Sequence, residues 1–347
     1  MDESPGWEAI DAALRRIYGD QEPAHYGTLL RWSLGGPDPL DGISAYPRTE
    51  PVPHWHFVSY GMTELYSKES DDLQESGWGF EFTFRLVRDP AETTPPAWAL
   101  SFLQNLARYV YNSGNWFEPG HHMNVNGPIA SERDDSEIRA IGFVPDPELG
   151  GISTPHGRVE FLQIVGLAAE EYEALQRWNA VALMELLAPR MPLYTTDLDR
   201  RSLLGDPQVA AAVQAGIERD GSTSGTLYVN KAHWERDGAT TTLRIGALQA
   251  ASVGQTLRGR LPFGRALVLQ TDDTRLRFHP SDAPVIEQPD AAALSVGVPA
   301  EALDELVAAL VPRASVTPLA AMPGVVVEIV PTAMLDRYGE ETGEVVG

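Results

Sequence analysis

Two histidines with a single residue between them, His54 and His56, are the residues of this sequence best suited to catalysis or metal binding. In a strand they would project from the same face, as two imidazole ligands of a mononuclear metal site do. Such a site needs a third or fourth ligand, which Glu64 or the pair His121 and His122 could supply, and the sequence does not select among them. A half-buried strand whose histidines bond to neighbouring groups explains the same pattern without a metal.

Other catalytic signatures are absent from the sequence. It has no cysteine, which excludes thiolate nucleophiles, disulfides and zinc–thiolate sites. The serines of residues 221–225 do not have the Gly-x-Ser-x-Gly spacing of a nucleophile elbow, and no phosphate loop, dinucleotide fingerprint or His-Glu-x-x-His motif occurs. We therefore expect a protein that is not an enzyme and needs no cofactor, with a metal-dependent hydrolase that uses His54 and His56 as an alternative.

The charge of the chain restricts its partners. There are 49 acidic and 26 basic residues, for a formal net charge of −23. Such a surface repels phosphate backbones and anionic lipids, which argues against nucleic acid or membrane as a partner. It would attract a basic protein, although solubility alone also explains it. The N-terminus does not resemble a signal peptide, and no apolar run approaches the roughly 18–20 residues that cross a bilayer, so a cytoplasmic location is expected.

Residues 78–86 are the element around which a core would form. Large apolar side chains at every second position predict a strand with one buried face. On the opposite side of this strand, Glu81 could be a buried acid with a raised pKa. The apolar positions are Trp78, Phe80, Phe82, Phe84 and Leu86.

The remaining pattern predicts an α/β to α+β protein with two domains. The expected N-terminal domain, residues 1–230, has a mixed sheet with flanking helices, and the smaller C-terminal domain, residues 231–347, is mixed and strand-rich. Residues 35–53 are crowded with glycine and proline, which favours an irregular surface segment. Helices are expected at residues 5–18, 96–112, 168–187, 207–217 and 299–310. Further strands are expected at residues 54–60, 157–166, 243–248, 256–263, 265–270, 274–279, 294–298 and 325–330.

Several collinear segments resemble the Suppressor of fused (SUFU) family. They are HWHFVSYGMTELY (54–66), SGWGFEFTFRL (76–86), PAWALSFLQNLARYVYNSGNWF (96–117), TPHGRVEFLQIVG (154–166), the helix with ALQRWN and MELL (174–187) and GIERDGSTSG (216–225). The resemblance covers the N-terminal two-thirds strongly, and LRGRLPFGRALVLQ (257–270) is similar to the C-terminal domain of the family more weakly. We expect a bacterial member.

The resemblance implies a protein-binding function. In animal members, the two domains close around an extended peptide of a Gli transcription factor, which pairs with strand edges of both by β-strand addition. Bacterial members are associated with toxin systems, where they act as immunity proteins. We therefore expect an immunity protein that neutralises a cognate toxin, such as a basic one, through an interdomain cleft. The alternative within the same class is an intracellular scaffold or negative regulator that sequesters a protein partner.

The resemblance also nominates binding residues. A tyrosine and a phenylalanine of the family's cleft are matched by Tyr109 and Phe117, and an aspartate beyond the following strand by Asp146. Two other acidic cleft positions appear here as His121 and Pro145, so the salt bridges to a basic peptide residue are partly missing. Trp116 is a further large ring in the glycine- and asparagine-rich stretch 113–127. The expected partner-binding residues are Tyr109, Trp116, Phe117, His121 and Asp146.

Overall fold

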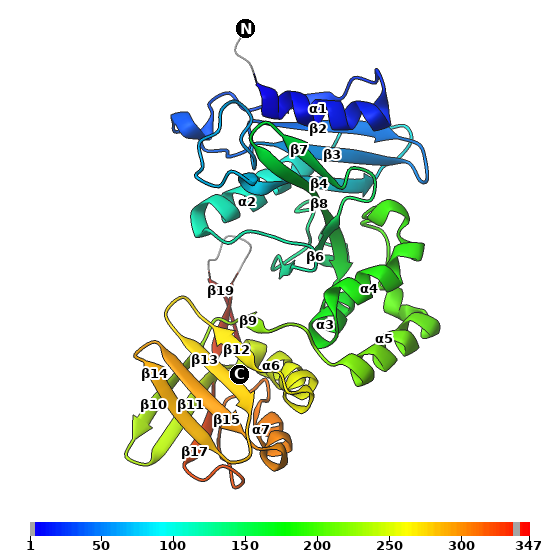
Figure 1. Ribbon diagram of the computed structural model, residues 1–347. Helices are drawn as coiled ribbons and strands as arrows, with labels where there is room; N and C mark the ends of the chain where they lie inside the picture. Colours follow the sequence, from blue (N-terminus) through cyan, green and yellow to red (C-terminus); the bar gives the residue numbers. More distant parts are fainter. Residues whose placement is uncertain (1–3, 336–340) are drawn as a thin grey trace. The chain divides into compact units, whose positions relative to one another are not determined.

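The chain folds into two compact units, which are described separately (Figure 1). The computed structural model describes residues 4–335 and 341–347. The first unit contains Met1–Tyr172 and Met184–Leu203, and the second contains Glu173–Leu183 and Leu204–Gly347. The domain boundary after residue 230 stays a prediction, and residues 204–230 are part of the second compact unit.

The first unit is built on an eight-stranded mixed sheet. Its strands lie in the order β1-β2-β3-β4-β8-β6-β5, and β7 pairs with β8 outside this path. Neighbouring strands are antiparallel except β4 and β8, which run parallel. The strands are β1 (Ala24–Gly27), β2 (Gly42–Arg48), β3 (His54–Tyr60), β4 (Glu75–Val87), β5 (His122–Asn124), β6 (Ile138–Pro145), β7 (Gly151–Thr154) and β8 (Gly157–Ala168).

Two helices cover opposite faces of this sheet (Figure 1). α1 (Pro5–Tyr18) packs Leu14 into a cluster with Phe161 of β8. α2 (Ala97–Ser113) packs Leu103 into a cluster with Leu162, the next residue of β8. Because successive strand residues point to opposite faces, the two clusters lie on the two sides of the sheet. Both predicted helices and the strands at residues 54–60 and 157–166 are confirmed.

The central strand β4 differs from its prediction in one respect. Its alternation is as expected, but the prediction of a single buried face is wrong. Glu81, Thr83 and Arg85 on the second face are as fully buried as Phe82 and Phe84 on the first. The reason is that α1 and the elements around it cover the second face, where polar side chains satisfy one another instead of meeting water.

Two other predictions need correction. Residues 35–53 are not irregular throughout, because they contain the buried strand β2. The single helix expected at residues 168–187 is two helices, α3 (Ala169–Arg177) and α4 (Ala180–Leu187). The break lies at Asn179, whose side-chain oxygen accepts a hydrogen bond from the backbone of Ala182 at 2.9 Å and so caps the start of α4.

The second unit combines two sheets with helices around one apolar core. The sheets have the strand orders β10-β11-β17-β16 and β14-β15-β13-β12-β9, and β18 and β19 form a separate pair. The core includes Leu243 and Leu276 from the two sheets and Val253 and Leu306 from the helices. The strands are β9 (Thr226–Tyr228), β10 (Ala232–Asp237), β11 (Thr240–Gly246), β12 (Leu267–Gln270), β13 (Arg275–Pro280), β14 (Val285–Asp290), β15 (Ala293–Val298), β16 (Ser315–Pro318), β17 (Val325–Val330), β18 (Thr332–Leu335) and β19 (Glu341–Val346). The helices are α5 (Pro207–Asp220), α6 (Ala247–Arg260) and α7 (Leu303–Ala309).

One expected strand of the second unit is a helix. The prediction of an extended segment at residues 256–263 is wrong, because they complete α6 and a short 3₁₀ turn, Leu261–Phe263. Buried positions at Ala250, Val253 and Leu257 recur every three or four residues, which is the helical period. The short window at residues 256–263 contains too little of this repeat to reveal it.

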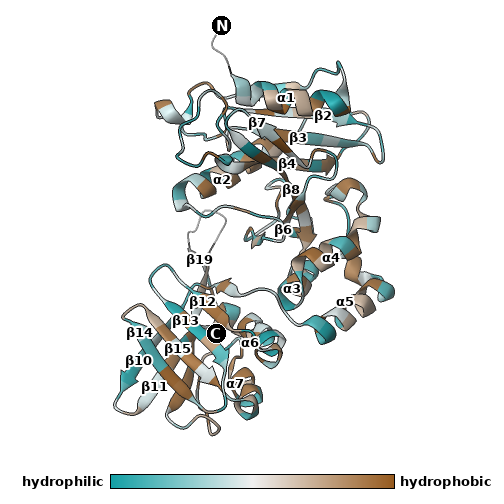
Figure 2. Cartoon of the chain, in the orientation of Figure 1, coloured by the Kyte–Doolittle hydropathy of each residue, from teal (hydrophilic) through white to brown (hydrophobic). Residues whose placement is uncertain are grey.

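The two-domain fold of mixed α/β character is confirmed. Figure 2 shows hydrophobic and hydrophilic residues interspersed along the strands and helices of both units. Within the described ranges, no helix is both long and apolar enough to cross a bilayer.

Candidate functional site

Four of the five predicted binding residues gather on α2 and the loop that follows it. The rings of Tyr109 and Phe117 stack with centroids 5.7 Å apart. The indole nitrogen of Trp116 donates to Glu118 Oε1 at 3.1 Å, and Nδ1 of His121 accepts from the backbone N–H of Glu118 at 3.2 Å. Trp116 is 56% exposed and Tyr109 37%. We call Tyr109, Trp116, Phe117 and His121 the aromatic corner.

The backbone fixes the aromatic corner to the edge of the sheet. α2 ends at Gly114, which adopts the left-handed conformation at φ 72° that favours glycine, and its N–H donates to Val110 at 2.9 Å. The loop that follows Gly114 then runs beside strand β6. Gly120 donates to the carbonyl oxygen of Phe143 at 2.8 Å, and Phe143 donates to that of His121 at 3.0 Å. The loop is therefore held in place at both ends.

Phe117 is the buried member of the aromatic corner and connects it to the core of the sheet. Its side chain is only 7% exposed and stacks on Phe143, with centroids 4.2 Å apart and an interplanar angle of 22°. It also contacts Phe82 of the central strand. A partner on this surface would therefore meet Trp116 and Tyr109, and Phe117 supports the ring of Tyr109.

The strand next to the corner, β5, is an edge of the sheet. It pairs with β6, and no second neighbour occurs among the described strands. The carbonyl oxygen of His121 and the N–H of Val125 bond to β6. Since these groups alternate along an antiparallel strand, the backbone N–H and C=O groups of His122 and Asn124 point away from β6. Such an unpaired row can accept another strand.

Sequence reasoning missed this edge. The three residues of β5 lie in the turn-rich stretch 113–127, and three residues are too few to show a two-residue period. They are recognisable as an edge only when β6 is seen on one side of them. In the sequence, His121 and His122 stand out for their imidazoles, whereas the backbone of His122 is the feature exposed for pairing.

The side chain of His122 is turned toward the protein. Its ring makes an edge-on contact with Tyr172, with centroids 5.3 Å apart. Burial lowers the pKa of His122 to about 4, and the charge of His121 adds to this effect. At neutral pH the imidazole is therefore uncharged.

Asp146, the fifth predicted binding residue, does not join the aromatic corner. It is 2% exposed and lies with Thr83 and Arg85, on the sheet face opposite Phe82. Arg85 Nη1 donates to Asp146 Oδ2 at 2.6 Å, and Thr83 Oγ1 donates to the same oxygen at 2.9 Å. The carboxylate is thus enclosed by its own chain and offers no surface to a partner.

The buried face around Asp146 is a charged network. Arg85 also donates to Glu148 Oε2 at 2.8 Å and to Gln163. His56 lies between Tyr18, whose hydroxyl is 2.6 Å from Nδ1, and Asp146, whose Oδ2 is 3.3 Å from Nε2. Burying both partners of an ion pair is costly unless they satisfy one another, as they do here.

The protonation states follow from these contacts. Burial by itself raises the pKa of Asp146, but the neighbouring His56 and Arg85 more than offset it and hold that pKa well below its usual range. Burial, aided by the charge of Arg85, lowers the pKa of His56 to about 4. The network therefore consists of an ionised aspartate and a neutral histidine at neutral pH.

The metal hypothesis finds no ligand set. His54 and His56 do share a face of β3, but Nδ1 of His54 lies 2.7 Å from the carbonyl oxygen of Val52. Glu64 is bound instead by Lys68 at 2.8 Å and by the backbone N–H of Ser70. Across residues 4–335 and 341–347, no group of three or more His, Cys, Asp or Glu side chains is arranged to hold an ion.

Glu81 is a buried acid, as the strand pattern allowed. Burial raises its pKa to about 7, against the effect of its hydrogen bonds. It accepts from Ser59 Oγ at 2.5 Å, from both the hydroxyl and the N–H of Thr63, and from the N–H of Gly61. These bonds join β4 to the connection that leaves β3, so we assign Glu81 a structural role.

Comparison with known proteins identifies relatives of this arrangement. A family model, "Suppressor of fused protein (SUFU)", matches residues 36–201. The human and mouse Suppressor of fused homologs are each 38% identical over 234 residues, which cover 62% of this chain and 48% of each relative. The chain thus matches about half the length of these curated relatives.

Solved structures show the same relationship. The crystal structure of Drosophila Suppressor of Fused has a TM-score of 0.78, with 21% identity over 94% of this chain and 97% of that one, and so shares the fold. The crystal structure of the Sufu–Fu complex contains a chain that is 31% identical, with a TM-score of 0.58. That match covers 61% of this chain and 98% of the other. With its sequence and fold both matched, the chain belongs to the Suppressor of fused family.

Proposed function

We propose that this chain is a protein-binding regulator without enzymatic activity, and that it binds an extended segment of its partner at the edge strand β5. The observation that carries this proposal is the unpaired backbone of His122 and Asn124 beside the aromatic corner. The relative in the Sufu–Fu complex, as its name states, binds a protein. In strand addition, backbone hydrogen bonds supply affinity and nearby side chains supply selectivity.

The aromatic corner suits the second of these tasks. Tyr109 and Trp116 are large side chains left partly exposed on a rigid support. Tyrosine and tryptophan are enriched among the residues that contribute most to protein interfaces, because they bury much area with little loss of rotamer freedom. A partner strand on β5 would bring its side chains to the same end of the sheet.

We further propose that the partner is a basic protein, and specifically a toxin that this chain neutralises. The support is the net charge of −23, which would speed the encounter with a basic surface. A regulator that sequesters a cellular protein by the same strand pairing is the second candidate, favoured by the animal relatives rather than by the charge.

Co-expression tests the proposal. Proteins encoded beside the gene would each be produced with the chain, and growth and co-purification measured. A toxin that becomes harmless and co-purifies supports immunity, whereas a non-toxic partner bound at the same edge supports sequestration. Tyr109→Ala should weaken capture roughly tenfold or more. Tyr26→Ala is the matched control, since Tyr26 is 39% exposed on β1 at the other edge of the sheet.

Proline substitution tests strand addition itself. Asn124→Pro removes an N–H that points away from β6, and therefore a bond to the partner, without removing one between β5 and β6. Asn124→Ala removes the same side chain but keeps the N–H. Loss of capture with proline and its retention with alanine is the expected pair of results. Equal capture by both variants, with circular dichroism unchanged, would rule out strand pairing at β5.

A further inference from the structure

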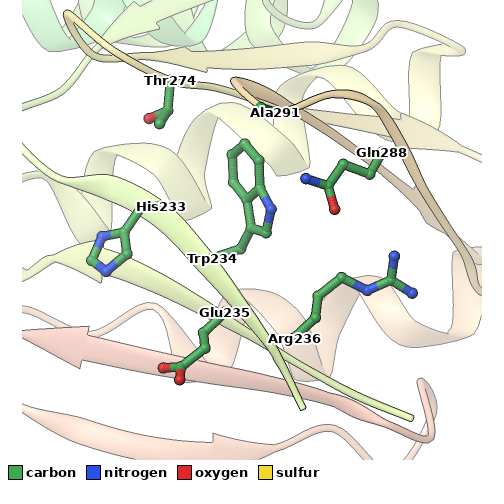
Figure 3. Close-up of a pocket in the computed structure, with 7 residues that line it drawn as sticks. All are labelled: His233, Trp234, Glu235, Arg236, Thr274, Gln288 and Ala291. Atoms are coloured by element: carbon green, nitrogen blue, oxygen red, sulfur yellow. The ribbon is translucent and has the colours of Figure 1, made fainter. Parts of the chain in front are cut away.

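The second unit contains a pocket that the proposed function does not use. It has a volume of about 410 Å³ and lies beside β10, the edge strand of its sheet. Figure 3 shows Trp234 and Arg236 of β10 on one side of this space, and Gln288 and Ala291 across from them. His233, Glu235 and Thr274 complete the lining of the pocket. The side chains of His233 and Glu235 leave β10 on the side opposite Trp234 (Figure 3).

The pocket exposes backbone hydrogen-bonding groups. Gly246 donates to Lys231 at 3.0 Å, which fixes the bonding pattern between β10 and β11. By alternation, the N–H and C=O groups of Ala232, Trp234 and Arg236 point away from β11. The hydroxyl of Thr274 indeed donates to the carbonyl oxygen of Ala232 from that side. The corresponding groups of Trp234 and Arg236 face the pocket beyond Thr274.

The side chains define what the pocket could select. The guanidinium of Arg236 forms no hydrogen bond or ion pair with any residue in the described ranges, although the chain has 49 acidic residues. By contrast, Arg244 on the adjacent strand contacts Glu235 at 2.8 Å and Glu328 at 2.7 Å. An unpaired guanidinium beside an indole and the amide of Gln288 suits a carboxylate on an apolar stem. Glu235, the acidic residue among those that line the pocket, is itself paired with Arg244. Charges farther away than roughly 8 Å are screened at physiological ionic strength.

We propose that this pocket binds an extended peptide segment, which adds a strand to β10 and places a carboxylate side chain against Arg236. The open backbone of Trp234 and Arg236 sets the extended conformation of the ligand, and the guanidinium sets its charge. This site is separate from β5 and prefers an acidic segment. If the pocket beside β10 does not bind acidic peptides, the proposed partner binding at β5 is unaffected. If partner binding at β5 fails, the proposal for the pocket is equally unaffected.

The absence of cysteine provides the test. Ala291→Cys introduces a single thiol at the rim of the pocket, which can capture cysteine-containing peptides by disulfide exchange. The probes are two acetylated and amidated pentapeptides whose terminal cysteine carries a mixed disulfide with 2-mercaptoethanol, and they differ only in Glu or Gln at the central position. The thiolate introduced by Ala291→Cys attacks this disulfide at the peptide sulfur, and 2-mercaptoethanol leaves as the thiol. Mass spectrometry measures the captured fraction against increasing 2-mercaptoethanol. The glutamate peptide should need about tenfold more reductant for release, because a charge-assisted hydrogen bond is lost with glutamine.

Matched variants make the result specific. Adding Arg236→Gln to Ala291→Cys should remove the preference for the glutamate peptide over the glutamine peptide. A variant that carries Ala239→Cys instead of Ala291→Cys, with its thiol in the turn between β10 and β11, should also show no preference. A glutamate peptide with an N-methylated backbone should lose its advantage, because it cannot pair with β10. Equal release of the two peptides would overturn the proposal. So would a preference that survives Arg236→Gln, appears at the Ala239→Cys thiol or is unaffected by N-methylation.

Discussion

Asp146→Asn separates a structural role of this carboxylate from a role in binding. The substitution keeps the shape of the side chain and removes its charge, so it acts on the ion pair with Arg85. Arg85 is completely buried and would keep one charged partner, Glu148, whose side chain is 24% exposed. An asparagine in place of the aspartate is not expected to compensate, because a neutral amide oxygen accepts more weakly than a carboxylate.

The expected loss of stability is large. Removing one partner of a buried ion pair leaves an uncompensated charge and costs about 3–5 kcal/mol. The contact with Glu148 places the expectation toward the lower end. For a unit of this size, such a change lowers the melting temperature by roughly 6–20 °C. Since domains are stable by only about 5–15 kcal/mol, the first unit should still fold at low temperature.

Calorimetry of the full chain measures the effect. Asp135→Asn is the control, since Asp135 pairs with Arg133 but its carboxylate is 73% exposed, and no measurable change is expected. Adding Arg85→Met to Asp146→Asn should recover part of the loss, because the stranded cation is removed with its partner. If Asp146→Asn left the melting temperature unchanged and abolished capture of a partner, the assignment of Asp146 to the buried network would be refuted.

Two further perturbations follow from the same structure. Phe117→Ala should cost about 3–5 kcal/mol in urea unfolding, because it empties a buried site beneath the aromatic corner, whereas the exposed Trp116→Ala should weaken partner capture with little loss of stability. The opposite order would contradict the division of the corner into support and contact. Acid should also destabilise the chain, because His54, His56 and His122 have pKa values lowered from 6.5 to about 4 by burial. The unfolded chain then binds more protons between those values, so stability present at neutral pH is lost as pH falls from about 6.5 toward 4, by about 2 kcal/mol at pH 5 for the fully buried His56. Glu81, whose pKa is raised to about 7, contributes stability that grows as pH falls over the same range, so the urea midpoints are compared in the Glu81→Gln variant. Midpoints of that variant that do not fall between about pH 7.5 and pH 5 would show that these imidazoles are not held neutral.

Much of the fold was determined by local sequence. The alternation in residues 78–86 required a strand, the capped pattern after Asp206 required a helix, and both occur because period and caps depend on neighbours along the chain. The family could also be identified, since its segments are long and collinear. Residues 256–263 show the limit of this reasoning, because a short apolar run fits either period.

Tertiary structure decided the roles of the candidate residues. The sequence nominates Asp146 and Phe117 as contacts, but folding encloses the first with Arg85 and stacks the second on Phe143. Conversely, β5 and β10 became candidate binding edges only through the strands that do and do not lie beside them. The sequence by itself specified the periods, the charge and the family. Burial and strand adjacency depend on residues far apart in the chain, and they determined which groups remain available to a partner.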